Sequence, residues 1–271
     1  MNQTPRGHPL RDSPEDVEVA RHIPDTPQTL SPAYRLAFAD QDFLTRRELR
    51  PVRLQLELLK TELGFDDAGI RSTVVMFGGA RIPAPRDTAS APAGLARLAP
   101  YYEQARRFAL LVTEKSLARG GTDNVIVTGG GPGVMEAGNL GAAEAGGRSV
   151  GLNIVLPHEQ APNVHVTPEL SFNFHYFAIR KMHFLMRASA IVVFPGGFGT
   201  LDELFETLTL IQTERMRRMP VLLFGEAFWR RIVDWEALVE AGTISPGDLD
   251  LFRFVETAEA AVEVIETWPW A

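Results

Sequence analysis

Short, uninterrupted apolar runs recur along the chain, and stretches with apolar residues at helical spacing lie between them. Strands that are buried on both faces have this unbroken apolar character, whereas strands with one solvated face alternate apolar and polar residues. The pattern therefore predicts an α/β fold, a doubly wound, Rossmann-like parallel sheet with helices on both faces. The predicted strands are Thr73–Phe77, Val125–Thr128, 149–156, a run that ends at Phe194, and Val221–Phe224.

Helical periodicity between these runs predicts the helices that cover the sheet. In such sheets, ligands bind beyond the carboxyl ends of the strands, at the point where the strand order reverses. The turns that lead from a strand into the next helix are therefore the candidate binding region. The predicted helices end near 119 and 145 and cover about 175–188, 201–213, 229–239 and 258–265.

The N-terminal part of the chain has a different pattern. Residues 1–30 carry five prolines among charged residues and no apolar period, which predicts a flexible arm. Ser31-Pro32 has the form of a helix start, so residues 31–66 are expected to form a helical extension, broken near Pro51. Its leucines either cover the main domain or form an oligomer contact, and the sequence leaves both open. The nucleotide-binding catalytic domain is expected over 70–271.

Composition narrows the class of protein. The chain has 271 residues, 45% of them apolar, with no cysteine, a net charge of -7 and a pI near 5.5. This acidic balance argues against broad binding to nucleic acids or anionic membranes. No apolar run is long enough for a membrane helix, and the N-terminus lacks the apolar segment of a signal peptide. We therefore expect a cytoplasmic protein without disulfides.

Three glycine-rich turns directly follow predicted strands, at Gly78-Gly79, at 129–133 and at 195–200. Parallel strands would bring these turns to one rim of the sheet. None matches the dinucleotide fingerprint or the Walker phosphate loop, so NAD binding and ATP hydrolysis lose support. Each turn alone is explained by the need for glycine in a tight connection. Together they predict the walls of a site for one anionic ligand, with phosphate at a helix start.

Two charged groups near this rim have competing interpretations. Thr200-Leu-Asp-Glu203 fits a capping box, yet a carboxylate beside a phosphate site would also face a bound sugar. Arg180-Lys181 fits either a solvated helix face or a cationic pair at the rim. His175 and His183 do not have metal-ligand spacing, so no metal is expected.

The sequence Pro195-Gly-Gly-Phe-Gly-Thr-Leu-Asp-Glu203, preceded by Arg180-Lys181, resembles the Lonely guy (LOG) family of phosphoribohydrolases, formerly called "lysine decarboxylase-like". Residues 128–136, 151–160 and 208–213 are also similar to its longer bacterial members, and the likeness covers about 70–265. One turn departs from the family, because Gly78-Gly79-Ala80-Arg81 stands where relatives often have Gly-Ser. The missing hydroxyl puts one ligand contact in doubt.

The resemblance implies hydrolysis of the N-glycosidic bond of a purine nucleoside 5'-monophosphate, AMP or a cytokinin riboside monophosphate, to free base and ribose 5-phosphate. It implies no cofactor and a homodimer or larger homo-oligomer. Arg180 and Glu203 are the implied catalytic residues. The implied substrate-binding residues are Gly130, Gly131, Glu159, Lys181, Gly196, Gly197, Gly199 and Thr200.

Other functions fit parts of this pattern. Proteins of this fold also carry the molybdenum cofactor without hydrolysing anything, and a nucleotide-sensing protein is a further alternative. The paired Arg180 and Glu203 favour the enzyme, since a carrier has no need of that pair. A pyridoxal phosphate decarboxylase would need a lysine in the site, and only Lys181 is near it. Spacing does not predict the preferred base.

Overall fold

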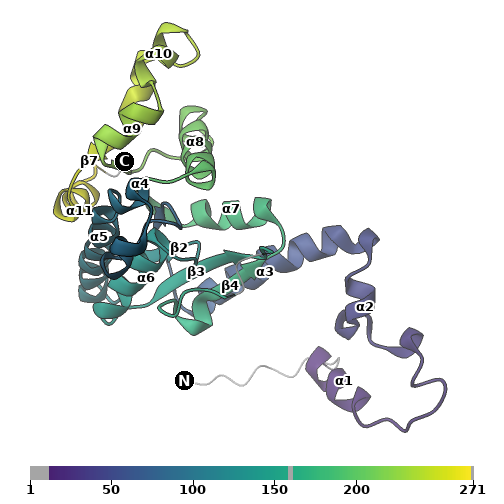
Figure 1. The fold of residues 1–271 in the computed structure, drawn as a ribbon. Coiled ribbons are helices and arrows are strands. Elements are labelled where there is room, and N and C mark those ends of the chain that lie inside the picture. The colour runs from purple at the N-terminus through teal and green to yellow at the C-terminus, as the bar shows by residue number, and fades with distance from the viewer. Residues whose placement is uncertain (1–11, 158–160, 270–271) are drawn as a thin grey trace. The chain divides into compact units, whose positions relative to one another are not determined.

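The computed structural model describes residues 12–157 and 161–269 (Figure 1). The chain divides into two units, residues 1–56 and residues 57–271. The second unit holds all seven strands described below, and it is built around one parallel sheet.

The sheet has the order β4-β3-β2-β1-β5-β6-β7, and every neighbouring pair is parallel. The predicted α/β architecture is thereby confirmed. The chain adds strands on one side of β1 as far as β4 and then returns to add β5 on the other side, so the order reverses between β1 and β5. The strands are β1 (Thr73–Phe77), β2 (Val125–Thr128), β3 (Ser149–Ile154), β4 (Ser171–Phe174), β5 (Ala188–Val193), β6 (Val221–Phe224) and β7 (Arg253–Val255).

Helices cover both faces of the sheet. On one face, α5 (Pro100–Ala118) packs on α6 (Val134–Glu144) and α11 (Ala258–Glu266), and Val74 and Met76 of β1 belong to this core. The opposite face of β1 meets α7 (Phe177–Met186), where the rings of Phe77 and Phe184 lie 4.9 Å apart. The remaining longer helices of the second unit include α8 (Phe198–Gln212), α9 (Glu226–Ile232) and α10 (Trp235–Glu240).

Several boundaries differ from the sequence prediction. The helix expected over 229–239 is two helices, because the chain is extended at Val233 and Asp234, and the Asp234 side chain accepts a hydrogen bond from the Ala237 N–H to cap α10. The prediction missed the edge strands β4 and β7. Both are short, and exposed side chains interrupt the apolar run in each.

The first unit contains short helical segments in its described residues, 12–56. An α-helix, α1 (Ser13–Ala20), forms where no helix was predicted. Ser31 does cap a helical turn, as expected, but that turn is a single 3₁₀ segment, Pro32–Tyr34. Pro51 lies in the first turn of α3 (Arg50–Asp67) and starts this helix rather than breaking it, because a first-turn residue needs no intrahelical N–H partner.

Candidate active site

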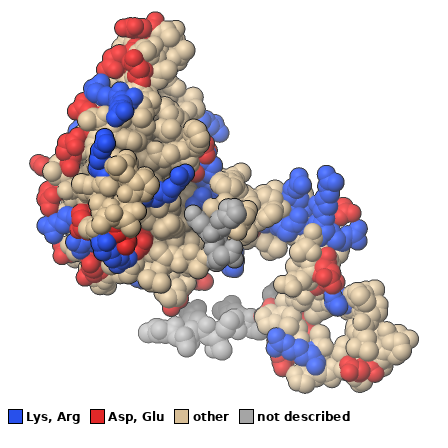
Figure 2. Space-filling model, in the orientation of Figure 1, with Lys and Arg blue, Asp and Glu red and all other residues tan. Residues whose placement is uncertain are grey.

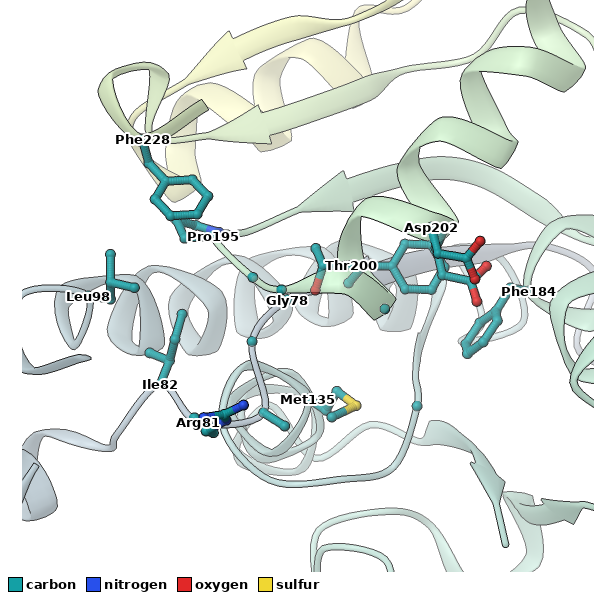
Figure 3. A pocket seen from close by; sticks show the side chains of 18 of the residues that line it. Gly78, Arg81, Ile82, Leu98, Met135, Phe184, Pro195, Thr200, Asp202 and Phe228 are labelled. Atoms are coloured by element: carbon teal, nitrogen blue, oxygen red, sulfur yellow. The ribbon is translucent and has the colours of Figure 1, made fainter. Parts of the chain in front are cut away.

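A cleft of about 540 Å³ opens at the carboxyl ends of β1 and β5, where the strand order reverses (Figure 3). The turns that follow β1 and β5 form two of its walls, and the start of α8 closes one side. This is the position at which open parallel sheets bind ligands. Apolar side chains contribute the rest of its surface, namely Phe77, Ile82, Leu95, Leu98, Met135, Phe177, Phe184 and Phe228.

The glycine-rich turn after β1 contacts both of the other glycine-rich turns at this rim. The Gly79 N–H donates to the Pro195 carbonyl at 2.9 Å, and the Val134 N–H donates to the Gly79 carbonyl at 3.3 Å. A Cβ added at Gly133 would lie 2.4 Å from the Gly79 oxygen, too close for any side chain. Glycine is therefore required for the close packing of these turns, and the expectation that they share one rim is confirmed.

The start of α8 presents open space to the cleft. Gly197 is the N-cap of this helix, and no side chain caps it. A Cβ at Gly197 or Gly199 would meet nothing within 4 Å, whereas a Cβ at Gly196 would lie 2.1 Å from Thr200 Oγ1. The first N–H groups of a helix have no partner within it and carry the positive end of its dipole. An anion bound next to Gly197 and Gly199 would accept hydrogen bonds from these N–H groups.

Glu203 is not a capping residue. Because α8 begins at Phe198, three residues earlier than predicted, Glu203 lies in the second turn, and the capping-box interpretation is wrong. Its side chain lines the cleft, yet the residue is only 7% exposed. Among the described residues, its Oε2 atom has no hydrogen-bond partner. A buried, unsatisfied carboxylate is costly, and such groups concentrate at functional sites.

The surroundings of Glu203 raise its pKa to about 7. Burial is the largest cause, since it disfavours the charged form. The positive charges of Lys181 and Arg180 lower the pKa, and the negative charges of Glu206 and Asp202 raise it. The carboxyl group therefore changes protonation state near neutral pH, which suits a group that exchanges protons in a reaction.

Arg180 extends from α7 into the same cleft. Its Nε donates to the Leu152 carbonyl at the end of β3 at 2.7 Å, and its guanidinium carbon lies 5.1 Å from the centre of the Phe184 ring. A Cβ at Gly129 would lie 2.7 Å from its Nη2 atom, so glycine leaves room for the guanidinium. The structure thus brings Arg180 and Glu203 to one cleft, with the arginine held in a fixed orientation.

Lys181, which the resemblance implies as a substrate-binding residue, lies between α7 and α8. It is not among the residues that line the cleft. Its Nζ lies 2.9 Å from Asp202 Oδ2 and 3.0 Å from Glu206 Oε2, so it links α7 to α8. Burial is the largest single influence on the pKa of Lys181 and lowers it, but the contacts with Asp202 and Glu206 and the negative charge of Glu203 together outweigh burial, so the pKa is raised.

Four of the expected substrate-binding residues line the cleft, namely Gly196, Gly197, Gly199 and Thr200. Gly130 and Gly131 do not line the cleft, and their carbonyls accept hydrogen bonds from the Asn163 side chain at 3.1 and 3.0 Å. Gly129, which was not among the expected residues, lines the cleft instead. Glu159 lies outside the described residues.

Sequence reasoning missed one residue that helps to position Arg180. The carboxylate of Glu57 on α3 accepts hydrogen bonds from the His175 and Tyr176 N–H groups, at 2.8 and 3.1 Å, and so caps the start of α7. These residues are more than a hundred positions apart in the chain, so no local pattern could have indicated the contact.

The structure also bears on metal binding and on membrane spans. Within residues 12–157 and 161–269, no cluster of three or more histidine, cysteine or acidic side chains has the arrangement of a metal site. In the same residues, no helix combines the length and apolar character needed to cross a bilayer. On the face of the second unit drawn in Figure 2, basic and acidic side chains are interspersed.

The chain matches a known protein family over the region that carries this site. The family is described as "Possible lysine decarboxylase", and the match covers residues 135–265. The matched segment is slightly less than half of the chain and includes Arg180, Glu203 and the turn after β5. Relatives that are named as LOG-type cytokinin riboside 5'-monophosphate phosphoribohydrolases confirm the resemblance to LOG proteins.

One such relative is the cytokinin riboside 5'-monophosphate phosphoribohydrolase LOG3 of Arabidopsis thaliana, 29% identical over 90 residues, or 33% of this chain and 42% of that protein. The bifunctional cytokinin biosynthesis protein of Fusarium pseudograminearum is 34% identical over 82 residues, or 30% of this chain and 17% of that protein. The matches thus span less than half of these relatives' length.

Solved structures are similar at a lower level. The molybdenum cofactor binding protein of Rippkaea orientalis superimposes with a TM-score of 0.48 and 18% identity, over 73% of this chain and 96% of that chain. The molybdenum cofactor carrier protein of Chlamydomonas reinhardtii has a TM-score of 0.45 and 18% identity, over 72% and 96% of the two chains.

Proposed function

We propose that this protein hydrolyses the N-glycosidic bond of purine nucleoside 5'-monophosphates to free base and ribose 5-phosphate. The observation that carries the proposal is the buried carboxylate of Glu203, whose Oε2 atom has no hydrogen-bond partner among the described residues. It lines the same cleft as Arg180 and the open start of α8. The names of the LOG relatives, which act on cytokinin riboside 5'-monophosphates, support the same reaction class.

The two ends of a nucleotide have matching surroundings in the cleft. Its volume of about 540 Å³ falls in the range of small-molecule sites. The phosphate would bind at Gly196, Gly197, Gly199 and Thr200, because α8 begins there and a Cβ at Gly197 or Gly199 would meet nothing within 4 Å. The ribose would then lie near Glu203, and the base would contact apolar residues of the cleft.

Glu203 would act on the sugar during bond cleavage. As the bond between C1' and the base nitrogen breaks, positive charge develops on the ribose, as in glycoside hydrolysis. A carboxylate nearby stabilises this state more than the uncharged ground state, which is the requirement for acceleration. The carboxylate also takes a proton from the attacking water, whose oxygen bonds to C1', while the electron pair of the broken bond stays on the base nitrogen. The base nitrogen then takes up one proton, from Glu203 or from solvent, and the carboxylate is restored. A pKa of about 7 suits this proton transfer.

Arg180 would position these groups rather than transfer a proton. A guanidinium stays charged at ordinary pH, so it is unsuited to act as an acid. Its hydrogen bond to Leu152 and its contact with Phe184 fix its orientation before substrate arrives. From there it would orient the Glu203 carboxylate and the ribose hydroxyls through directed N–H donors.

The proposal is tested by incubating the purified protein with AMP, other purine monophosphates and prenylated adenine monophosphates, and separating the released bases by chromatography. We expect base release from at least one monophosphate and none from Glu203→Gln. Tight binding of a nucleotide or pterin without base release would instead support the carrier. The preferred base follows from the relative rates in the same assay.

We also expect a homodimer or larger homo-oligomer and a cytoplasmic location, both of which stay predictions. Light scattering on the purified protein measures the first. Fractionation of cells that express the protein measures the second.

A further inference from the structure

Few cationic side chains line the cleft. Among the described residues that form its surface, only Arg81 and Arg180 carry a positive charge. Arg180 is already engaged with Leu152 and Phe184. Lys181 is bound to Asp202 and Glu206 and does not line the cleft. A phosphate group with nearly two negative charges therefore has one further candidate cation.

Arg81 is that cation, and no residue that the structure describes pairs with it. Its side chain is exposed, and it makes no hydrogen bond or ion pair within the part of the chain that the structure describes. Figure 3 shows Arg81 and Met135 on one side of the cavity, with Thr200 and Asp202 on the other. An exposed arginine is ordinarily just solvated. Arg81 differs because it faces the cleft to which the proposed function assigns a phosphate.

The backbone that carries Arg81 is firmly held. The Gly79 N–H donates to Pro195 at 2.9 Å, and the Ile82 N–H donates to the Gly79 carbonyl at 3.3 Å. The Ile82 side chain is only 3% exposed, so it anchors the residue that follows Arg81. The turn after β1 is thus fixed to the turn after β5, while the guanidinium stays free to close on a ligand.

We propose that Arg81 binds the 5'-phosphate of the substrate from the side opposite the start of α8, and thereby makes the site selective for nucleotides over nucleosides. This inference rests on the proposed function. The α8 amides would hold some phosphate oxygens, and the planar guanidinium would hold others through paired, charge-assisted hydrogen bonds. Arg81 would therefore be a binding residue that replaces the hydroxyl contact missing from this turn.

The test measures binding of ribose 5-phosphate by calorimetry, together with steady-state kinetics on AMP and adenosine. Arg81→Gln should weaken ribose 5-phosphate binding and raise KM for AMP by about 10- to 100-fold, the usual effect of losing hydrogen bonds to a charged group. Arg81→Lys should recover part of this loss. Adenosine has no phosphate, so its kcat/KM should stay unchanged and the preference for AMP should fall.

Arg231→Gln is the matched control, since Arg231 is an exposed arginine on α9 outside the cleft. It should bind ribose 5-phosphate as the parent does. Unchanged binding in Arg81→Gln, or no binding by the parent protein, would overturn the inference. If binding weakens as expected but no variant or parent releases base, the phosphate contact stands and the proposed hydrolysis fails.

Discussion

The Nζ of Lys181 lies 3.0 Å from Oε2 of Glu206. Lys181 follows Arg180 directly on α7, and Glu206 lies one helical turn beyond Glu203 on α8. The ion pair therefore connects the two helices next to the residues that the mechanism requires. Lys181 is only 16% exposed in its side chain, so its contribution is less screened by water than that of a surface pair.

Replacing Lys181 with methionine tests whether Lys181 lowers the pKa of Glu203. In the parent, kcat should rise with pH and level off above about 7, because the mechanism needs the carboxylate form of a group with that pKa. Lys181 lowers the pKa of Glu203, so its removal should shift the rising limb of the pH–rate profile to higher pH. Lys115→Met, which removes a distant surface lysine near Glu266, should leave the profile unchanged. A profile that does not move in Lys181→Met contradicts this role.

Glu203→Gln should stabilise the protein at alkaline pH while abolishing activity. The pKa of Glu203 is raised in the folded state, so folding keeps a proton that the unfolded chain releases above about 4.5. Protonated Glu203 therefore contributes to the free energy of unfolding at low pH, and this contribution is lost as the pH rises through about 7. A rise of the pKa from 4.5 to about 7 corresponds to a loss of about 3 kcal/mol.

Urea unfolding at pH 5 and pH 8 measures this difference. The free energies of unfolding of parent and variant should be similar at pH 5, and the variant should be the more stable at pH 8. Equal free energies of unfolding of parent and variant at both pH values would contradict this prediction, since burial of the charged Glu203 would then cost nothing.

Glu57→Gln should weaken the start of α7 and disturb Arg180. The carboxylate accepts two backbone N–H bonds, and loss of a cap of this kind costs about 1 kcal/mol. If Arg180 is positioned through α7, kcat should fall more than KM changes. Glu114→Gln, an exposed glutamate on α5, is the control. A variant that loses stability but keeps the parental kcat would restrict Glu57 to a structural role.

The sequence predicted the elements whose signal is local. The apolar runs of β1, β2 and β6 define buried strands, and the glycine turns after them need small residues for contacts that the structure displays. The start of α8 was misplaced because Thr200 resembles a cap. The helix instead starts at Phe198, next to Gly197, and no side chain caps it.

Features that depend on distant parts of the chain were not predictable. The Glu57 cap of α7 and the link from Lys181 to Glu206 appear only once the helices pack together. The burial of Glu203, and hence its pKa of about 7, likewise depends on packing that no spacing encodes. The pairing of Arg180 with Glu203 came from the family resemblance, and the shared cleft agrees with it.

The central claim is that Glu203 and Arg180 together break the bond between ribose and base. Quantifying adenine and ribose 5-phosphate released from AMP by the parent, Glu203→Gln and Arg180→Ala tests it most directly. The parent should form the two products in equal amounts, and each variant should fold yet turn over at least about 100-fold more slowly. Near-parental turnover in either folded variant would contradict the account.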